Sequence, residues 1–238
     1  KINKRTKAIL ICNPCNPTGY VYSKEEITKI ANLAKKNDLF IIVDEVYREF
    51  IYTNLKHFSI LEDKTFFDNA ILIDSTSKRY SLCGARIGFI VSKNSKFIET
   101  CMKFALARLS PPTVALIAAN NALKSDKIYI DNVIKEYSLR RKVLIGELSK
   151  MNNIKFSDPI GAFYSIIKLP VKNAEEFAKF LLTDFSINNE SVMLAPASGF
   201  YSSNEIGNDE VRIAFVLNSE KIKRAINIIK IGLKEYIG

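Results

Sequence analysis

The sequence has a single histidine, His57, among its 238 residues, and no apolar run that approaches the length of a bilayer-spanning helix. With one histidine, which follows a polar stretch and is expected in a loop, a general base has to be a lysine, a tyrosine or a carboxylate. A basic N-terminus precedes the apolar run Ala8–Cys12, but Asn13-Pro14 interrupts that run too early for a signal peptide. We therefore expect a cytoplasmic protein with no membrane partner.

Cysteine is also scarce, and two of the four cysteines, Cys12 and Cys15, form a C-x-x-C pair. A zinc site needs a second such pair, and Cys83 and Cys101 are too far apart to supply one. Prolines in the same stretch impose a turn where a redox pair would open a helix. We predict free thiols and no metal.

The formal charge of +10 brings a nucleic-acid partner into consideration. The basic residues are scattered at helical spacing among apolar ones, as in 221–230, and no basic block contains interleaved aromatic residues. This pattern is typical of solvated helix faces, so no nucleic-acid partner is predicted.

The first half of the chain alternates short strands with a helix. Continuous apolar runs, typical of strands buried on both faces of a parallel sheet, are Ala8–Cys12, Leu39–Val43 and Ala70–Ile73, with Ile87–Val91 as a further strand. Between the first two, Ser23 and Glu26 form a capping box ahead of the apolar helical face Ile27, Ile30, Ala31 and Ala34. This strand–helix–strand order predicts an α/β domain.

The second half follows a break at Ser110-Pro111-Pro112. Two helices are predicted first, over Thr113–Lys124 and Tyr129–Met151. After Asp158-Pro159 the predicted elements are strand Phe163–Leu169, helix Ala174–Phe185, strand Val192–Leu194, strand Val211–Val216 and helix Glu220–Tyr236. Strands mixed with flanking helices predict a smaller α+β domain.

Polar groups directly follow the three buried strands: Asn13–Gly19, Asp44–Tyr47 and Asp74–Lys78. In open α/β sheets, ligands bind outside the carboxyl ends of the strands. We therefore expect Asn16, Asp44, Tyr47, Ser75 and Lys78 to converge on one crevice.

Each charged residue also has a simple structural interpretation: Asp44 as a helix N-cap, Lys78 as a surface lysine and Arg86 as half of an ion pair. Arg212 lies in an apolar strand, where an arginine needs a carboxylate or phosphate partner. Together these residues match the needs of pyridoxal phosphate, which are a lysine for a Schiff base, an acid for a pyridinium nitrogen, and Arg and Ser for a phosphate.

The motifs, in their order, resemble those of the fold-type-I, class I/II aminotransferases, the aspartate aminotransferase superfamily. They are Asn13–Gly19 (NPCNPTG), Asp44–Tyr47 (DEVY), Ser75–Lys78 with Arg86 and Gly88 (STSK…GARIG), Gly161–Tyr164 (GAFY) and Arg212 with Phe215 (RIAF). The resemblance covers essentially the whole chain. It implies that residues 1–127 are the cofactor-binding half of the family's large domain and residues 128–238 its small C-terminal domain, beginning with a long interdomain helix.

The resemblance also implies residue roles. Lys78 matches the catalytic lysine that forms the internal aldimine with pyridoxal 5′-phosphate and then moves the substrate proton. Asp44 matches the acid on the pyridine nitrogen, while Tyr47 and Asn16 match the groups on the cofactor's 3′-oxygen. Ser75 and Arg86 match the phosphate ligands. Arg212 matches the arginine that binds the substrate α-carboxylate, and Asn16 is expected to contact the substrate as well as the cofactor.

The function that the resemblance implies is transamination between an L-amino acid and a 2-oxo acid by a homodimer, with aspartate as the default substrate. Two alternatives stay open: another pyridoxal-phosphate reaction, such as a β-lyase or decarboxylase, and a non-enzymatic sensor domain of a transcription regulator. Family members normally carry a further N-terminal portion with a phosphate loop and a stacking ring. We therefore expect this chain to be a fragment that is inactive when isolated.

Overall fold

The structure, a computed structural model, describes residues 1–203 and 205–238. Their contacts divide into two units, which are described one at a time. The first unit contains Lys1–Cys15 and Tyr20–Ile134, and the second contains Asn16–Gly19 and Lys135–Gly238. The assignment of 1–127 and 128–238 to a cofactor half and a small domain remains a prediction.

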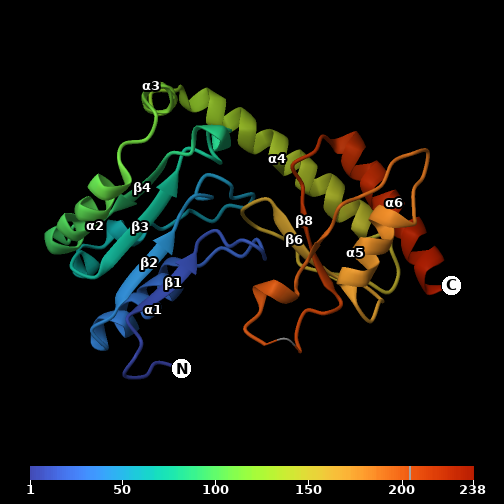
Figure 1. The fold of residues 1–238 in the computed structure, drawn as a ribbon, viewed down its shortest axis with the longest axis horizontal. Helices are drawn as coiled ribbons and strands as arrows, with labels where there is room; N and C mark the ends of the chain where they lie inside the picture. The colour runs from blue at the N-terminus through green and yellow to red at the C-terminus, as the bar shows by residue number, and fades with distance from the viewer. Residues whose placement is uncertain (204) are drawn as a thin grey trace. The chain divides into compact units, whose positions relative to one another are not determined.

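A four-stranded sheet forms the centre of the first unit (Figure 1). Its strands, in spatial order, are β1 (Ala8–Cys12), β2 (Phe40–Asp44), β3 (Ala70–Ser75) and β4 (Gly88–Val91). The first three are parallel and β4 runs antiparallel to β3. Because Cys12 pairs with Asp44 and Asp44 with Ile73, the three parallel strands end side by side. The expected α/β fold is confirmed, with each strand within one or two residues of its predicted bounds.

The core of this unit lies between the sheet and helix α1 (Lys24–Lys36). The predicted capping box is present, with Ser23 accepting from the Glu26 N–H and Glu26 accepting from the Ser23 N–H. Helix residues Ile27, Ala31 and Ala34 pack on alternate residues of the strands, which are Ile41, Val43, Ala70 and Leu72. Because side chains alternate between the two faces of a strand, every second strand residue points toward α1.

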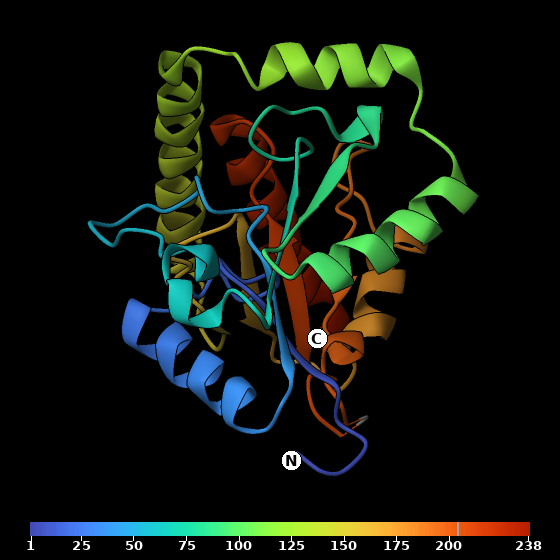
Figure 2. The ribbon, with the colours of Figure 1, turned by 90° about the vertical axis from the view of Figure 1, so that its left-hand side faces the viewer.

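Two further helices follow β4, α2 (Ser95–Arg108) and α3 (Thr113–Ala122). Figure 2 shows α1 and α2 on opposite sides of the sheet, and Phe97 of α2 meets Phe40 of β2 with ring centroids 5.6 Å apart. Sequence reasoning predicted α3 but not α2. None of the α2 residues is buried, although Asn94 caps the helix by accepting the Phe97 N–H.

The second unit has an antiparallel sheet in the order β5 (Lys155–Phe156), β6 (Tyr164–Lys168), β8 (Glu210–Ala214) and β7 (Ala195–Pro196). The predicted strand Val192–Leu194 is wrong, because these three residues have no strand pairing and the short strand begins at Ala195. The three side chains instead line an apolar cavity. Their apolar character therefore reflects their place in the cavity wall and not pairing in a β-sheet.

The helices associated with this sheet are α4 (Lys127–Leu148), whose residues up to Ile134 fall in the first unit, α5 (Ala174–Thr183) and α6 (Ser219–Ile237). Asn173 and Asn218 cap α5 and α6. A Cβ at Gly232 of α6 would lie 2.7 Å from Leu181 of α5, so a glycine allows these helices to approach closely. Short 3-10 turns within the described residues are Ile60–Glu62, Lys64–Phe66, Cys83–Ala85 and Ser198–Phe200. Among the described residues, no helix has both the length and the hydrophobicity needed to cross a membrane.

Candidate active site

The carboxyl ends of β2 and β3 carry most of the predicted site residues. Strand alternation places Val43 and Glu45 toward α1, so Asp44 projects from the opposite face of the sheet. Of the seven residues predicted to act in the site, five lie in the first unit and two, Asn16 and Arg212, in the second.

Asp44 is a half-buried acid whose Oδ1 accepts the Val46 N–H at 3.1 Å. This is a two-residue turn contact and no helix begins here, so the N-cap interpretation is wrong. Burial raises the pKa of the carboxyl above its ordinary value; the Val46 bond lowers it, nearby Asp74 raises it and Lys78 lowers it. In the described part of the chain, Asp44 forms no ion pair.

Lys78 follows β3 in a turn, and its Nζ lies 5.7 Å from the ring centroid of the buried Tyr47. The interpretation as an ordinary surface lysine does not fit this half-buried position. Ser75 Oγ is 2.8 Å from both Ile87 O and Ser77 Oγ and accepts the Ser77 N–H at 3.1 Å. These bonds shape the turn that carries the lysine, whereas a phosphate contact for Ser75 remains a prediction.

Arg86 follows the 3-10 turn Cys83–Ala85 with a left-handed backbone, φ 57° and ψ 37°. Its side chain is exposed, and Nη1 donates to Cys83 O at 2.9 Å. No acidic partner is found for it within residues 1–203 and 205–238, so the structure gives no support to the ion-pair interpretation. Its proposed phosphate role is a prediction.

Glu45, next to Asp44, was not singled out from the sequence. It is fully buried and accepts three bonds, from Ser59 Oγ at 2.9 Å, from the Ile60 N–H at 3.0 Å and from His57 Nε2 at 3.0 Å. His57 is in a loop, as expected, and its Nδ1 is buried without a hydrogen-bond partner among the described residues. The Glu45 carboxylate thus ties the loop 57–60 to the end of β2.

A second group that sequence reasoning missed lies beside Lys78. Arg79 Nη2 donates to both oxygens of Asp74, at 2.8 and 2.6 Å, and Arg48 Nη2 lies 3.3 Å from Asp74 Oδ2. Glu49 completes the set, 3.5 Å from both Arg48 and Arg79. The available signal was an acid at the end of one buried strand and an arginine five residues later.

In the second unit, Arg212 of β8 donates from Nη1 to Asn16 Oδ1 at 2.9 Å. Its guanidinium lies between two rings, 4.7 Å from the centroid of Tyr164 and 5.0 Å from that of Phe200. Nε is buried and finds no hydrogen-bond partner among the described residues, and none of their acids pairs with this arginine. The substrate-binding role of Asn16 and Arg212 remains a prediction, and the guanidinium retains capacity for an anion.

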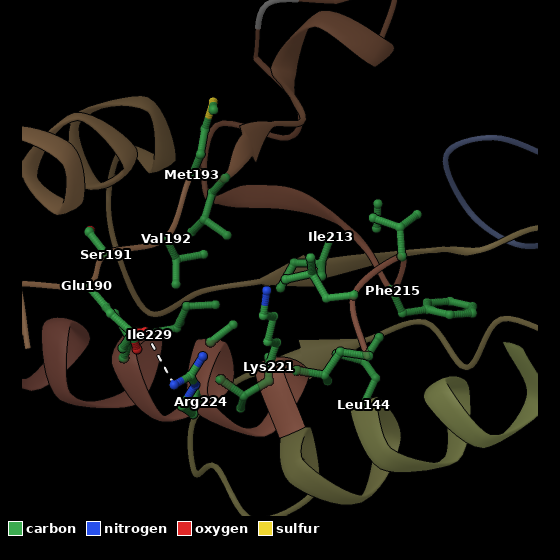
Figure 3. Close-up of a pocket in the computed structure, with 18 of the residues that line it drawn as sticks. Leu144, Glu190, Ser191, Val192, Met193, Ile213, Phe215, Lys221, Arg224 and Ile229 are labelled. Carbon is green, nitrogen blue, oxygen red and sulfur yellow. Dashed lines mark ion pairs between the residues drawn. The ribbon is translucent and has the colours of Figure 1, made fainter. Parts of the chain in front are cut away.

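The second unit also contains a cavity of about 840 Å³, bordered by β8, α6 and the segment 189–195 (Figure 3). Its lining is mostly apolar and includes Val192, Ile213 and Phe215. Arg224 in its wall is directed toward Glu190, at an ion-pair distance of 3.3 Å. Of the residues predicted to act in the site, Arg212 is the one that lines this cavity.

Metal chemistry finds no support in the described residues, which contain no cluster of three or more His, Cys, Asp or Glu side chains suited to an ion. None of the four cysteines forms a disulfide within the described residues.

Known structures share this fold. An aromatic aminotransferase from Pyrococcus horikoshii superposes with a TM-score of 0.87 at 31% identity, covering 99% of this chain and 62% of that structure. An aspartate aminotransferase from Thermotoga maritima superposes with a TM-score of 0.84, also at 31% identity, covering 98% and 58%. The fold is thus that of the fold-type-I aminotransferases.

Sequence comparison gives the same result. The family model for aminotransferase class I and II matches residues 1–229, and the chain belongs to this family. It is 33% identical to an aspartate aminotransferase of Pyrococcus abyssi over 239 residues, which is 98% of this chain and 59% of that relative. The chain therefore spans about three-fifths of the length of the curated relatives it matches. Members of this family generally depend on pyridoxal phosphate.

Proposed function

We propose that the protein to which this chain belongs transfers an amino group between an L-amino acid and a 2-oxo acid, with pyridoxal 5′-phosphate attached at Lys78. The observation that carries the proposal is the pairing, at adjacent strand ends, of a lysine over Tyr47 with a half-buried acid that has no ion-pair partner among the described residues. Relatives named as aspartate and aromatic-amino-acid aminotransferases support the reaction class.

The residues of the first unit fit the cofactor on physical grounds. A half-buried carboxylate is costly unless a positive group faces it, and the raised pKa of Asp44 reflects that cost. A protonated ring nitrogen would supply the missing positive charge, and Asp44 would hold the proton there. When bound, the cofactor supplies a carbonyl that combines reversibly with amines and a cationic ring that withdraws electrons from the substrate.

The remaining roles fall to groups of the chain itself. Lys78 Nζ takes the proton from the substrate α-carbon and returns it later. Tyr47 and Asn16 orient the cofactor through its 3′-oxygen, and Ser75 and Arg86 bind its phosphate. Arg212, whose guanidinium lacks an acidic partner in the described chain, binds the substrate α-carboxylate. Aspartate is the first substrate to test because several relatives are aspartate aminotransferases.

Borohydride reduction of the complete protein with its cofactor, followed by peptide mapping, tests the attachment site. The phosphopyridoxyl group is expected on Lys78 and absent from a Lys78→Ala variant. A label on Lys93 or Lys103 in its place would overturn the assignment.

The reaction class is tested by product analysis with labelled aspartate, with and without an added 2-oxo acid. Transamination requires the oxo acid and returns a new amino acid, whereas a β-lyase or decarboxylase forms product without it. Sedimentation of the same protein tests the proposed homodimer.

A further inference from the structure

The charged group beside Lys78 joins the two segments that carry the proposed chemistry. Asp74 and Arg79 lie on either side of Lys78 in sequence, while Arg48 and Glu49 directly follow Tyr47. Arg79 is 6% exposed and Asp74 is 9% exposed, so this pair is buried. Neither residue has a role in the proposed function.

The contacts restrict Lys78 from both directions along the chain. On its C-terminal side, Arg79 Nη2 is bonded to both Asp74 oxygens, and Asp74 Oδ1 also accepts the Ser75 N–H at 2.8 Å. The turn from 74 to 79 is thereby closed by its own end residues. The contacts from Arg48 and Glu49 at 3.3 and 3.5 Å then connect this turn to the one that bears Tyr47.

The charges of the group balance. Arg48 and Arg79 are positive and Asp74 and Glu49 are negative, so the sum is zero. The charges of Asp74, Lys78 and Glu45 all act on the Asp44 carboxyl, those of Asp74 and Glu45 against its ionisation and that of Lys78 in favour of it. Without Arg79 the group would carry one net negative charge near Asp44, with Arg48 left as the cation at 3.3 Å from Asp74, and that charge would oppose the ionisation of Asp44.

We infer that Arg79 is a positioning residue: through its two bonds to Asp74 it holds Lys78 against Tyr47 and keeps the charge of Asp74 from suppressing the ionisation of Asp44. The consequence for catalysis rests on the proposed function. The geometric and electrostatic effects belong to the protein without cofactor, so they can be measured whether or not that function holds.

Three variants separate these effects. Arg79→Met removes the charge and the bonds. Arg79→Lys keeps the charge but replaces the planar guanidinium, whose Nη2 bonds to Asp74 and whose Nη1 lies 3.5 Å from Glu49, with a single ammonium group. The double variant Asp74→Asn/Arg79→Met removes both partners and restores the charge balance. Arg224→Met is the matched control, because Arg224 is a more exposed arginine at 3.3 Å from a glutamate.

Two measurements on the folded, cofactor-free protein are needed. Carbon-13 NMR follows the titration of the Asp44 carboxyl, assigned with Asp44→Asn. Competitive acetylation with limiting acetic anhydride, followed by peptide mapping, gives the reactivity of Lys78 relative to Lys93.

In Arg79→Met the Asp44 titration midpoint should rise by about half a pH unit or more, and in the double variant it should return to near the wild-type value. Arg79→Lys should keep the midpoint but change the relative reactivity of Lys78 by about twofold or more. Arg224→Met should change neither.

An unchanged Asp44 midpoint together with unchanged Lys78 reactivity in Arg79→Met would overturn the inference. If that variant does not fold, Arg79→Lys decides, because unchanged Lys78 reactivity there contradicts the positioning role. Failure of the borohydride label on Lys78 would overturn the proposed function and leave these results standing.

Discussion

Replacing Glu45 should destabilise the first unit more than any substitution of an exposed acid. Its carboxylate is fully buried and accepts three bonds of 2.9 to 3.0 Å, two from side chains and one from the Ile60 N–H. Glu45→Ala leaves the buried Ile60 N–H and the partly buried Ser59 and His57 side chains without their acceptor. Removing one partner from a buried charged network costs about 3–5 kcal/mol, and we expect a loss in that range.

Glu45→Gln separates charge from hydrogen bonding. The amide keeps one oxygen, which can continue to accept from Ser59 and Ile60, but it replaces the oxygen that faces His57 with an NH₂ group. The His57 contact then persists only if the ring nitrogen accepts. We expect a loss of about 1–2 kcal/mol for this variant.

Two assays give the magnitudes. Urea unfolding followed by far-UV circular dichroism gives the global effect, and hydrogen exchange of the segment 57–62 gives the local one, because the Ile60 amide is bonded to the carboxylate. A loss of 3 kcal/mol in local stability corresponds to roughly 100-fold faster exchange. The control is Glu220→Gln, whose side chain is 79% exposed and pairs only with Lys223 among the described residues; it should change stability by about 0.5 kcal/mol or less. A Glu45→Ala variant within about 1 kcal/mol of wild type, with unchanged protection at residue 60, would refute the reasoning.

Three further outcomes are expected. Asp44→Ala should leave cofactor bound but sharply reduce turnover in the complete protein, while Asp44→Glu is milder; near-normal turnover of the Ala variant would contradict the role of Asp44. Arg212→Lys should lose roughly 2–4 kcal/mol in kcat/KM for every amino acid tested, since all share the α-carboxylate; a defect confined to acidic substrates would point to side-chain recognition. Gly19→Ala should destabilise the second unit in thermal melts, because Gly19 has φ +71° and an added Cβ would lie only 2.2 Å from a proline carbon. Gly146→Ala should stabilise it by about 0.5–1 kcal/mol, because Gly146 lies in a helix with open space around it. Similar melting of the two variants would refute this.

The sequence predicted most of the fold because its elements carry strong local signals. The continuous apolar run Ala8–Cys12 matches β1 at both ends, and the capping box at Ser23 marks the start of α1. Helix α2 was missed although Asn94 marks its start as an N-cap, and none of its residues is buried. The prediction of a strand at Val192–Leu194 was wrong because a short apolar run can line a cavity as well as form a buried strand.

The candidate site was less predictable, because its members interact over distances in sequence that no motif reports. Nothing in the local pattern says that Glu45 bonds to residues 57–60, and the spacing of Asp74 and Arg79 does not by itself say that the two are buried together. Sequence patterns identify which residue types stand at a strand end. Partners and burial decide which of them are available for chemistry.

The presence or absence of an oppositely charged partner distinguishes residues that stabilise the fold from residues that are available for chemistry. Glu45 and Asp44 are neighbours on opposite faces of one strand end, yet the first has three donors and the second has one backbone N–H and a raised pKa. Among the arginines, Arg79 has two carboxylates while Arg212 has an amide oxygen and two aromatic rings but no acid in the described chain. A buried charge that is satisfied by its own chain stabilises the fold. One that is left without its counter-ion is costly to keep, and a ligand that brings the missing charge accounts for that cost.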